Sequence, residues 1–224
     1  MKIDRRFKTP LYTLILFIVW TVLVKVVDTA PIGPMGTVVG FSSVNGAVHN
    51  LLGTSDLWYR ASEILGYTAI LLCAVFAIIG LVQLIQRKSL AKVDKKLIAA
   101  GVIYLCVIIV YVLFDKVIVN YRPVIMPGET APEASYPSTH TMLGCVGYGI
   151  GAILLPDYLN NRSLGAAVRP LCWILAGLTV LFRLLSGVHW LTDIIGGVII
   201  SAFFLTLFYA AYRKIDHMER KARK

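Results

Sequence analysis

Charged residues are scarce in this chain, and acidic residues are scarcest. Of its 224 residues only 15% are charged, with 12 Asp and Glu against 22 Lys and Arg. With a 58% hydrophobic share and a mean hydropathy of +0.75, this composition excludes an ordinary water-soluble globule. Cysteine is also rare, and its four copies lie in apolar segments without a CxxC spacing, at Cys73, Cys106, Cys145 and Cys172. They predict small buried hydrophobic side chains rather than a disulfide framework or a cysteine metal site.

Long apolar segments are abundant. A helix that spans a bilayer needs about 20 mostly apolar residues. Six segments approach this length: Pro10 to Val27, Ile64 to Gln86, Leu97 to Phe114, Thr141 to Pro156, Pro170 to Leu185 and Ile194 to Tyr212. We therefore expect an all-α, polytopic membrane protein with six transmembrane helices, formed by a single domain over residues 1–224.

The basic residues predict the orientation of these helices. They are concentrated in the N-terminal segment, in the loops after the second and fourth apolar segments, and in the tail 213–224, which we interpret as a solvated charge run. Because Lys and Arg accumulate on the cytoplasmic side, we expect both termini in the cytoplasm of a cell whose plasma membrane holds the protein. Topology and attraction to anionic lipid explain the net charge of +10 without a nucleic-acid partner.

Two long connections then lie on the outer side. Residues 28–60 are rich in glycine and half apolar, so we expect them to fold against the membrane surface, and residues 115–138 form a proline-containing loop. Asp28, Asp56 and Glu63 are expected to be loop or helix-start charges.

The stretch SGVHWLTD places His189 four residues before Asp193, at the start of the last apolar segment. If a helix begins near His189, both side chains lie on one face, one turn apart. The carboxylate can then accept a hydrogen bond from one imidazole nitrogen and leave the other as a nucleophile. Taken alone, the same pair also fits an interfacial histidine that caps a helix.

The stretch PSTH places Ser138 and His140 just before the fourth apolar segment. Serine is a favourable N-cap, and the free N–H groups of a helix start bind anions. His140 then stands beside the anion, where it can give a proton to a leaving oxygen.

Basic side chains complete this outer cluster. NYRP contains Arg122, Lys116 lies six residues earlier, and Arg183 lies near the end of the fifth apolar segment. Arginine presents a planar fork that matches phosphate oxygens, and lysine presents a point charge. The combination predicts a phosphate pocket with a nucleophile and an acid.

KVIVNYRP, PSTH and RLLSGVHWLTD, in this order, resemble the three signatures of the type 2 phosphatidic acid phosphatase superfamily, over a core of residues 115–193. The resemblance implies hydrolysis through a phosphohistidine without a metal ion or cofactor. His189 is then the nucleophile, Asp193 orients it, and His140 is the general acid. The phosphate oxygens are held by the remaining motif residues: Arg122, Arg183, Ser138, Thr139 and Lys116.

Three positions depart from the family pattern. Asp115 occupies the strict lysine position, so we assign the role to the neighbouring Lys116. Thr139 stands where the family has glycine, and Phe182 stands where it has serine before Arg183.

We therefore expect a membrane enzyme that hydrolyses a lipid phosphate or diphosphate at the outer face. The resemblance suggests undecaprenyl diphosphate first, then phosphatidylglycerol phosphate and phosphatidic acid. Phosphotransfer to a second lipid is a related alternative, and an inactive relative that binds lipid phosphates is another. A third alternative is a metal site in which His140, His189 and Asp193 are the ligands. The sequence leaves the oligomeric state open.

Overall fold

The computed structural model describes residues 4–222, and six long helices make up most of them. They are α1 (Lys8–Val26), α3 (Asp56–Arg87), α4 (Lys95–Lys116), α5 (Thr139–Leu154), α6 (Arg162–Leu185) and α7 (Leu191–Ala222). All six are long and apolar enough to cross a membrane, once a short 3₁₀ turn is added to each of α1 and α5. The prediction of an all-α membrane protein with six spanning helices is confirmed.

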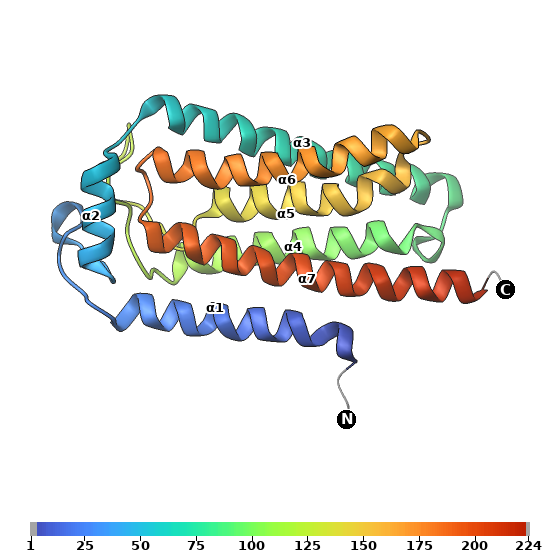
Figure 1. The fold of residues 1–224 in the computed structure, drawn as a ribbon, viewed down its shortest axis with the longest axis horizontal. Helices are drawn as coiled ribbons and strands as arrows, with labels where there is room; N and C mark the ends of the chain where they lie inside the picture. The colour runs from blue at the N-terminus through green and yellow to red at the C-terminus, as the bar shows by residue number, and fades with distance from the viewer. Residues whose placement is uncertain (1–3, 223–224) are drawn as a thin grey trace.

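Helix α5 lies at the centre of the bundle, with α3, α4, α6 and α7 packed around it (Figure 1). Its glycines permit these close contacts. A Cβ atom on Gly144 would lie 2.6 Å from Thr179 of α6, and one on Gly149 would lie 2.5 Å from Leu205 of α7. Small residues let membrane helices approach closely, because van der Waals contact holds them together in lipid.

The outer helices expose apolar side chains. The most hydrophobic 18-residue windows of α3 and α4 have mean hydropathies of 2.7 and 2.9, yet only 11% and 22% of their residues are buried within the protein. Such surfaces are stable only against hydrocarbon, and each helix satisfies its own backbone hydrogen bonds there. The bundle therefore presents α3 and α4 to the bilayer.

The first residue of α1 and the last of α7 lie at the same end of the bundle (Figure 1). At the opposite end, the connection 28–60 contains a helix that the sequence analysis did not predict, α2 (Ser42–Leu52), which runs across the bundle. The Asp28 carboxylate accepts hydrogen bonds from Ser43 N, at 2.8 Å, and from Ser42 Oγ, at 3.1 Å. It thereby holds the first turn of α2. We call this end of the molecule the α2 end.

Two helix boundaries differ from the predicted ones in ways that matter for the site. Helix α3 begins at Asp56, because an ion pair between Asp56 and Arg60 supports an exposed polar first turn. Glu63 is therefore an internal helix residue, and its assignment as a terminal charge is wrong. Helix α7 begins at Leu191, so His189 precedes the helix instead of starting it. The same helix continues through the charged tail to Ala222.

Candidate active site

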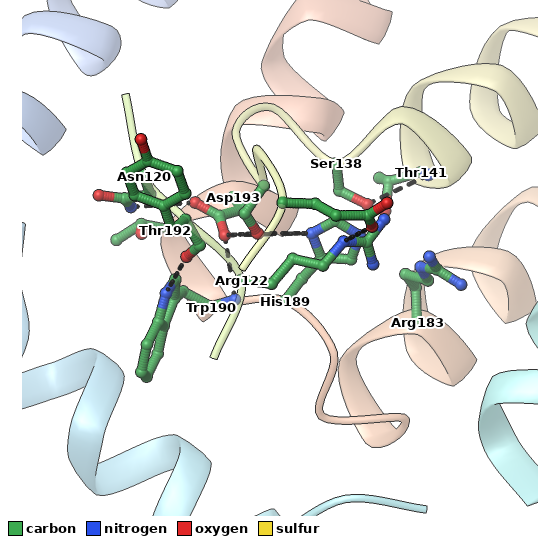
Figure 2. A network of polar contacts seen from close by, with 12 residues as sticks. Asn120, Arg122, Ser138, Thr141, Arg183, His189, Trp190, Thr192 and Asp193 are labelled. Atoms are coloured by element: carbon green, nitrogen blue, oxygen red, sulfur yellow. Dashed lines mark hydrogen bonds and ion pairs between the residues drawn. The ribbon is translucent and has the colours of Figure 1, made fainter. Parts of the chain in front are cut away.

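His189 lies at the α2 end, in the tight turn between α6 and α7 (Figure 2). The turn depends on Gly187, which has a φ of +68° and lies so close to Gly53 that a Cβ atom would be 2.0 Å from the Gly53 carbonyl oxygen. Only glycine fits this conformation and this space. The Trp190 indole then anchors the turn by donating to the Tyr121 carbonyl oxygen at 2.8 Å.

Ser135 bridges His189 and Asp193. The Ser135 hydroxyl donates to Asp193 Oδ2 at 2.6 Å, and His189 Nδ1 lies 2.9 Å from the same Ser135 oxygen. Because the single hydroxyl proton points to the carboxylate, His189 Nδ1 must carry the hydrogen that Ser135 Oγ accepts. The direct distance from His189 Nδ1 to Asp193 Oδ2 is 4.0 Å. The predicted direct hydrogen bond is thus replaced by a bridged one, since the histidine lies outside the helix that carries the aspartate.

Asp193 is completely buried and its carboxylate is fully engaged. Asn120 Nδ2 donates to Oδ1 at 3.1 Å, and the Trp190 backbone N–H donates to Oδ2 at 3.1 Å (Figure 2). Asp193 also lies in the first turn of α7, where the helix dipole favours a negative charge. This carboxylate is therefore a fixed acceptor at the base of the site.

The first turn of α5 forms the second part of the site. Ser138 is its N-cap and accepts from the Thr141 N–H, as predicted, and the Ser138 N–H donates to the Asp193 carbonyl oxygen at 3.0 Å. This bond joins the start of α5 to the start of α7. His140 follows in the first turn, and its Nε2 lies 2.8 Å from Glu63 Oε1 of α3. Ser138 is fully buried, so its contribution is through the cap.

The two arginines come from different elements. Arg122 Nε lies 3.0 Å from Glu133 Oε2, without the alignment of a hydrogen bond. The side chain of Arg183 is only 1% exposed, and its Nη1 donates to Glu63 Oε1 at 2.9 Å and to Ser62 Oγ at 3.1 Å. Arginine keeps its charge even when buried, so both supply permanent positive charge.

Several buried polar atoms of the site are without a hydrogen-bond partner within residues 4–222. They are Arg122 Nε, His140 Nδ1, Thr141 Oγ1, Arg183 Nε and His189 Nε2, five of the seven such atoms. Buried polar groups are normally paired, so a cluster of unpaired ones indicates a place where a ligand binds. Guanidinium donors favour an anion with several oxygens, such as phosphate.

Two adjoining cavities lie at this cluster. The polar cavity, of about 180 Å³, is lined by Arg122, Thr139, His140 and His189 among others. The apolar cavity, of about 460 Å³, lies between α3, α4 and α5 and shares Tyr111, Thr139 and His140 with the polar one. A phosphate group in the first cavity can thus be continuous with a hydrocarbon chain in the second.

Lys116 points away from the polar cavity, and of the other predicted site residues Ser138, Arg183 and Asp193 lie beside the cavity without lining it. The Lys116 side chain is 78% exposed and pairs with Asp115 at 2.8 Å, whereas Asp115 itself lines the cavity. The α4 helix ends at Lys116, and this register turns the lysine outward.

Burial, together with the positive charges of Arg122, Arg183 and His140, lowers the pKa of His189 well below its usual 6.5. A neutral imidazole with its hydrogen on Nδ1 has a lone pair on Nε2. His189 is therefore in the state that a nucleophile requires at neutral pH.

Sequence reasoning missed Ser135, Ser62 and the role of Glu63, and it quoted Asn120 without assigning it a function. Ser135 has no spacing signal, because it lies in a loop whose path depends on the whole bundle. Glu63 did offer a signal, since a carboxylate at the edge of an apolar segment is costly unless it has a partner.

The bundle and its cavities define a class: an integral membrane protein with a histidine-centred anion site at one end of its helices. Residues 95–216 match the PAP2 superfamily, so the chain belongs to that superfamily. A solved structure with a similar fold is described as the first transmembrane PAP2 type phosphatidylglycerolphosphate phosphatase from Bacillus subtilis. It has a TM-score of 0.59 and 20% identity, with 95% of this chain and 96% of that chain covered. No curated protein matches the chain. Superfamily membership supports a membrane phosphatase.

Proposed function

We propose that this protein is a lipid phosphatase that uses His189 as its nucleophile and acts on the outer face of the plasma membrane. The observation that carries the proposal is the geometry of His189. Its Nδ1 hydrogen is held by Ser135, its Nε2 has no partner within residues 4–222, and the residue lines the polar cavity with Arg122 and His140.

In the first step, the Nε2 lone pair of His189 attacks phosphorus and forms a P–N bond. The bond from phosphorus to the lipid oxygen breaks, and its electron pair leaves with that oxygen, which takes a proton from His140. In the second step, His140 takes a proton from water as the water oxygen attacks phosphorus. The P–N electron pair then returns to His189, and the net change is hydrolysis of one phosphate bond.

The arginines stabilise the charge that spreads over the equatorial phosphate oxygens in both steps. Their donors are already fixed in a buried site, so little reorganisation is needed at the transition state. This role in other phosphotransfer sites belongs to a metal ion, so we expect activity to persist in excess EDTA.

The apolar cavity supports a lipid substrate, because it continues from the polar cavity toward the bilayer-facing surfaces of α3 and α4. Undecaprenyl diphosphate is our first choice of substrate, with phosphatidylglycerol phosphate and phosphatidic acid next. The outer placement rests on the basic residues of the loop after α3 and the C-terminal tail, which lie at the end of the bundle opposite the α2 end.

The test is phosphate release by the purified protein from these three lipids side by side. We expect release from at least one, retained in excess EDTA, and a loss of at least 1,000-fold in His189→Ala, on the order seen when a nucleophile is removed. Absence of release from all three would leave only a protein that binds lipid phosphates. Radiolabelled phosphate that appears on a second lipid instead of in water would identify a phosphotransferase.

A further inference from the structure

Glu63 is a charged residue of the site that the motifs do not contain. It lies in α3, outside residues 95–216 that match the superfamily, and its side chain is only 19% exposed. One of its oxygens, Oε1, lies 2.8 Å from His140 Nε2 and 2.9 Å from Arg183 Nη1. A carboxylate held between two site cations needs a reason, because burial of a charge is costly without a function or a pairing.

The face of α3 that carries Glu63 is shaped to receive His140. Gly66 lies one turn further along the same face, and a Cβ atom there would come within 3.1 Å of His140 Cδ2. Ser62 and Tyr59, on the preceding turn, hold the Arg183 guanidinium, by a hydrogen bond and by a ring whose centre is 5.2 Å away. The packing therefore presses the His140 ring against α3 and fixes its distance from Glu63.

The contact determines which His140 nitrogen is available for chemistry. Glu63 can only accept, so a hydrogen lies on His140 Nε2. Nδ1 is then the remaining nitrogen, and it is buried without a partner in the part of the chain that the structure describes. A carboxylate that holds one ring nitrogen sets the orientation and tautomer of the other.

We propose that Glu63 is the positioning residue of His140, and that it directs Nδ1 to the leaving oxygen and compensates the positive charge that His140 carries before it gives up its proton. The inference rests on the proposed phosphatase function. When the ester bond breaks, the leaving oxygen receives the electron pair of that bond and the Nδ1 proton, and His140 stays bound to Glu63 through Nε2–H.

The two histidines thus have carboxylate partners of different kinds. Ser135 separates His189 from Asp193, whereas Glu63 contacts His140 directly. A direct contact stabilises a charged ring far more than one through a neutral hydroxyl group. The contact with Glu63 therefore favours the protonated form of His140, whereas His189 has no direct carboxylate contact.

The test compares two leaving groups. Dioctanoyl phosphatidic acid has an alkyl leaving oxygen that needs a proton, whereas p-nitrophenyl phosphate releases a stable anion that does not. For Glu63→Gln we expect kcat/KM to fall roughly 10-fold or more with the lipid and less than about 3-fold with the aryl ester, since general acid catalysis typically contributes 100-fold or more. A purely structural role would lower both values equally.

Asp56→Asn is the matched control, because it removes the same charge from an exposed ion pair on the same helix. It should leave both values unchanged. If Glu63→Gln does not elute as a folded protein in detergent, Glu63→Asp replaces it: this keeps the charge but withdraws it by one methylene, and the same selective loss is expected.

Two outcomes overturn the proposal. Equal losses with both substrates in a folded variant would show that Glu63 does not act through His140. Tighter inhibition by inorganic phosphate in Glu63→Gln, with higher kcat/KM for both substrates, would show that Glu63 instead competes with phosphate for Arg183. If the wild-type protein releases phosphate from neither substrate nor from the other lipid phosphates, the proposed function itself fails, which is a separate result.

Discussion

Ser135→Ala tests the bridge between His189 and Asp193 most directly. The substitution removes the Ser135 hydroxyl group and leaves Asp193 Oδ2 4.0 Å from His189 Nδ1, beyond hydrogen-bond range. A hydrogen bond to a charged group contributes about 1.5–3 kcal/mol. Since 1.4 kcal/mol corresponds to tenfold in rate, loss of this contact should lower kcat roughly 10- to 100-fold if it orients the imidazole in the transition state.

The assay is release of inorganic phosphate from dioctanoyl phosphatidic acid by protein in detergent. The matched control is Ser201→Ala, because Ser201 is also buried but donates only to backbone carbonyl oxygens, of Gly197 on α7 at 2.6 Å and of Met142 on α5 at 3.4 Å. We expect the control to keep at least half of the wild-type activity.

A double-mutant cycle with Asp193→Asn adds the decisive comparison. If Ser135 and Asp193 act in series on His189, the double variant should be no more than about 3-fold slower than the slower single variant, because residues that act as a unit are not additive. Full activity in Ser135→Ala, or losses that multiply in the double variant, would refute the bridged arrangement.

Three further predictions follow from the same geometry. Lys116→Ala should change kcat/KM less than about 2-fold, whereas Arg122→Ala should lower it roughly 100-fold or more, because of these two residues only Arg122 lines the polar cavity. A reversed ranking in phosphate-release assays would restore the assignment of Lys116 made from the sequence. The lowered pKa of His189 should place the acid limb of the pH profile of kcat/KM below pH 6.5, after correction for substrate ionisation, and an acid limb above pH 6.5 would contradict it. The same shift makes the protein less stable in acid. Below pH 6.5 His189 binds a proton in the unfolded state but not in the folded state, so its contribution lowers the free energy of unfolding as pH falls. Gly187→Ala should lower the midpoint of thermal unfolding by several degrees or prevent folding, because the new Cβ atom would overlap the Gly53 carbonyl oxygen. An unchanged midpoint would show that the turn can move.

The sequence alone was enough to predict the six spanning helices, because bilayer thickness converts hydropathy directly into helix length. It also predicted which motifs meet. Ser138 as the α5 cap and His140 in its first turn follow from local spacing, and the structure places them beside the turn that carries His189. Sequence spacing is a reliable guide where a residue acts within a single short element, such as a helix cap.

Contacts between elements could not be predicted in this way. Ser135 bridges His189 and Asp193 from a loop, and Glu63 reaches His140 from a helix about 80 residues earlier in the chain. The outward turn of Lys116 likewise depends on where α4 ends, and a shift of one residue rotates a helical side chain by about 100°. These errors arise because tertiary packing sets the register and the partners, whereas spacing sets only the candidates.

The cost of unpaired buried polar atoms explains why so much of the bundle supports this site. Each buried polar group without a partner costs about 1–3 kcal/mol, and the guanidinium and imidazole atoms at this site are of that kind. A flexible protein would relieve the cost by collapse or by admission of water. Here the Gly187 turn, the bond from Ser138 N–H to Asp193, and the α3 wall around Arg183 and His140 oppose that relief, because each is fixed by contacts between different helices. Under the proposed function, the phosphate group would supply partners for these atoms, and the interaction would be largest where the transferring phosphoryl group carries the most diffuse charge. Under the proposed function, these contacts between helices therefore serve the chemistry as well as the fold.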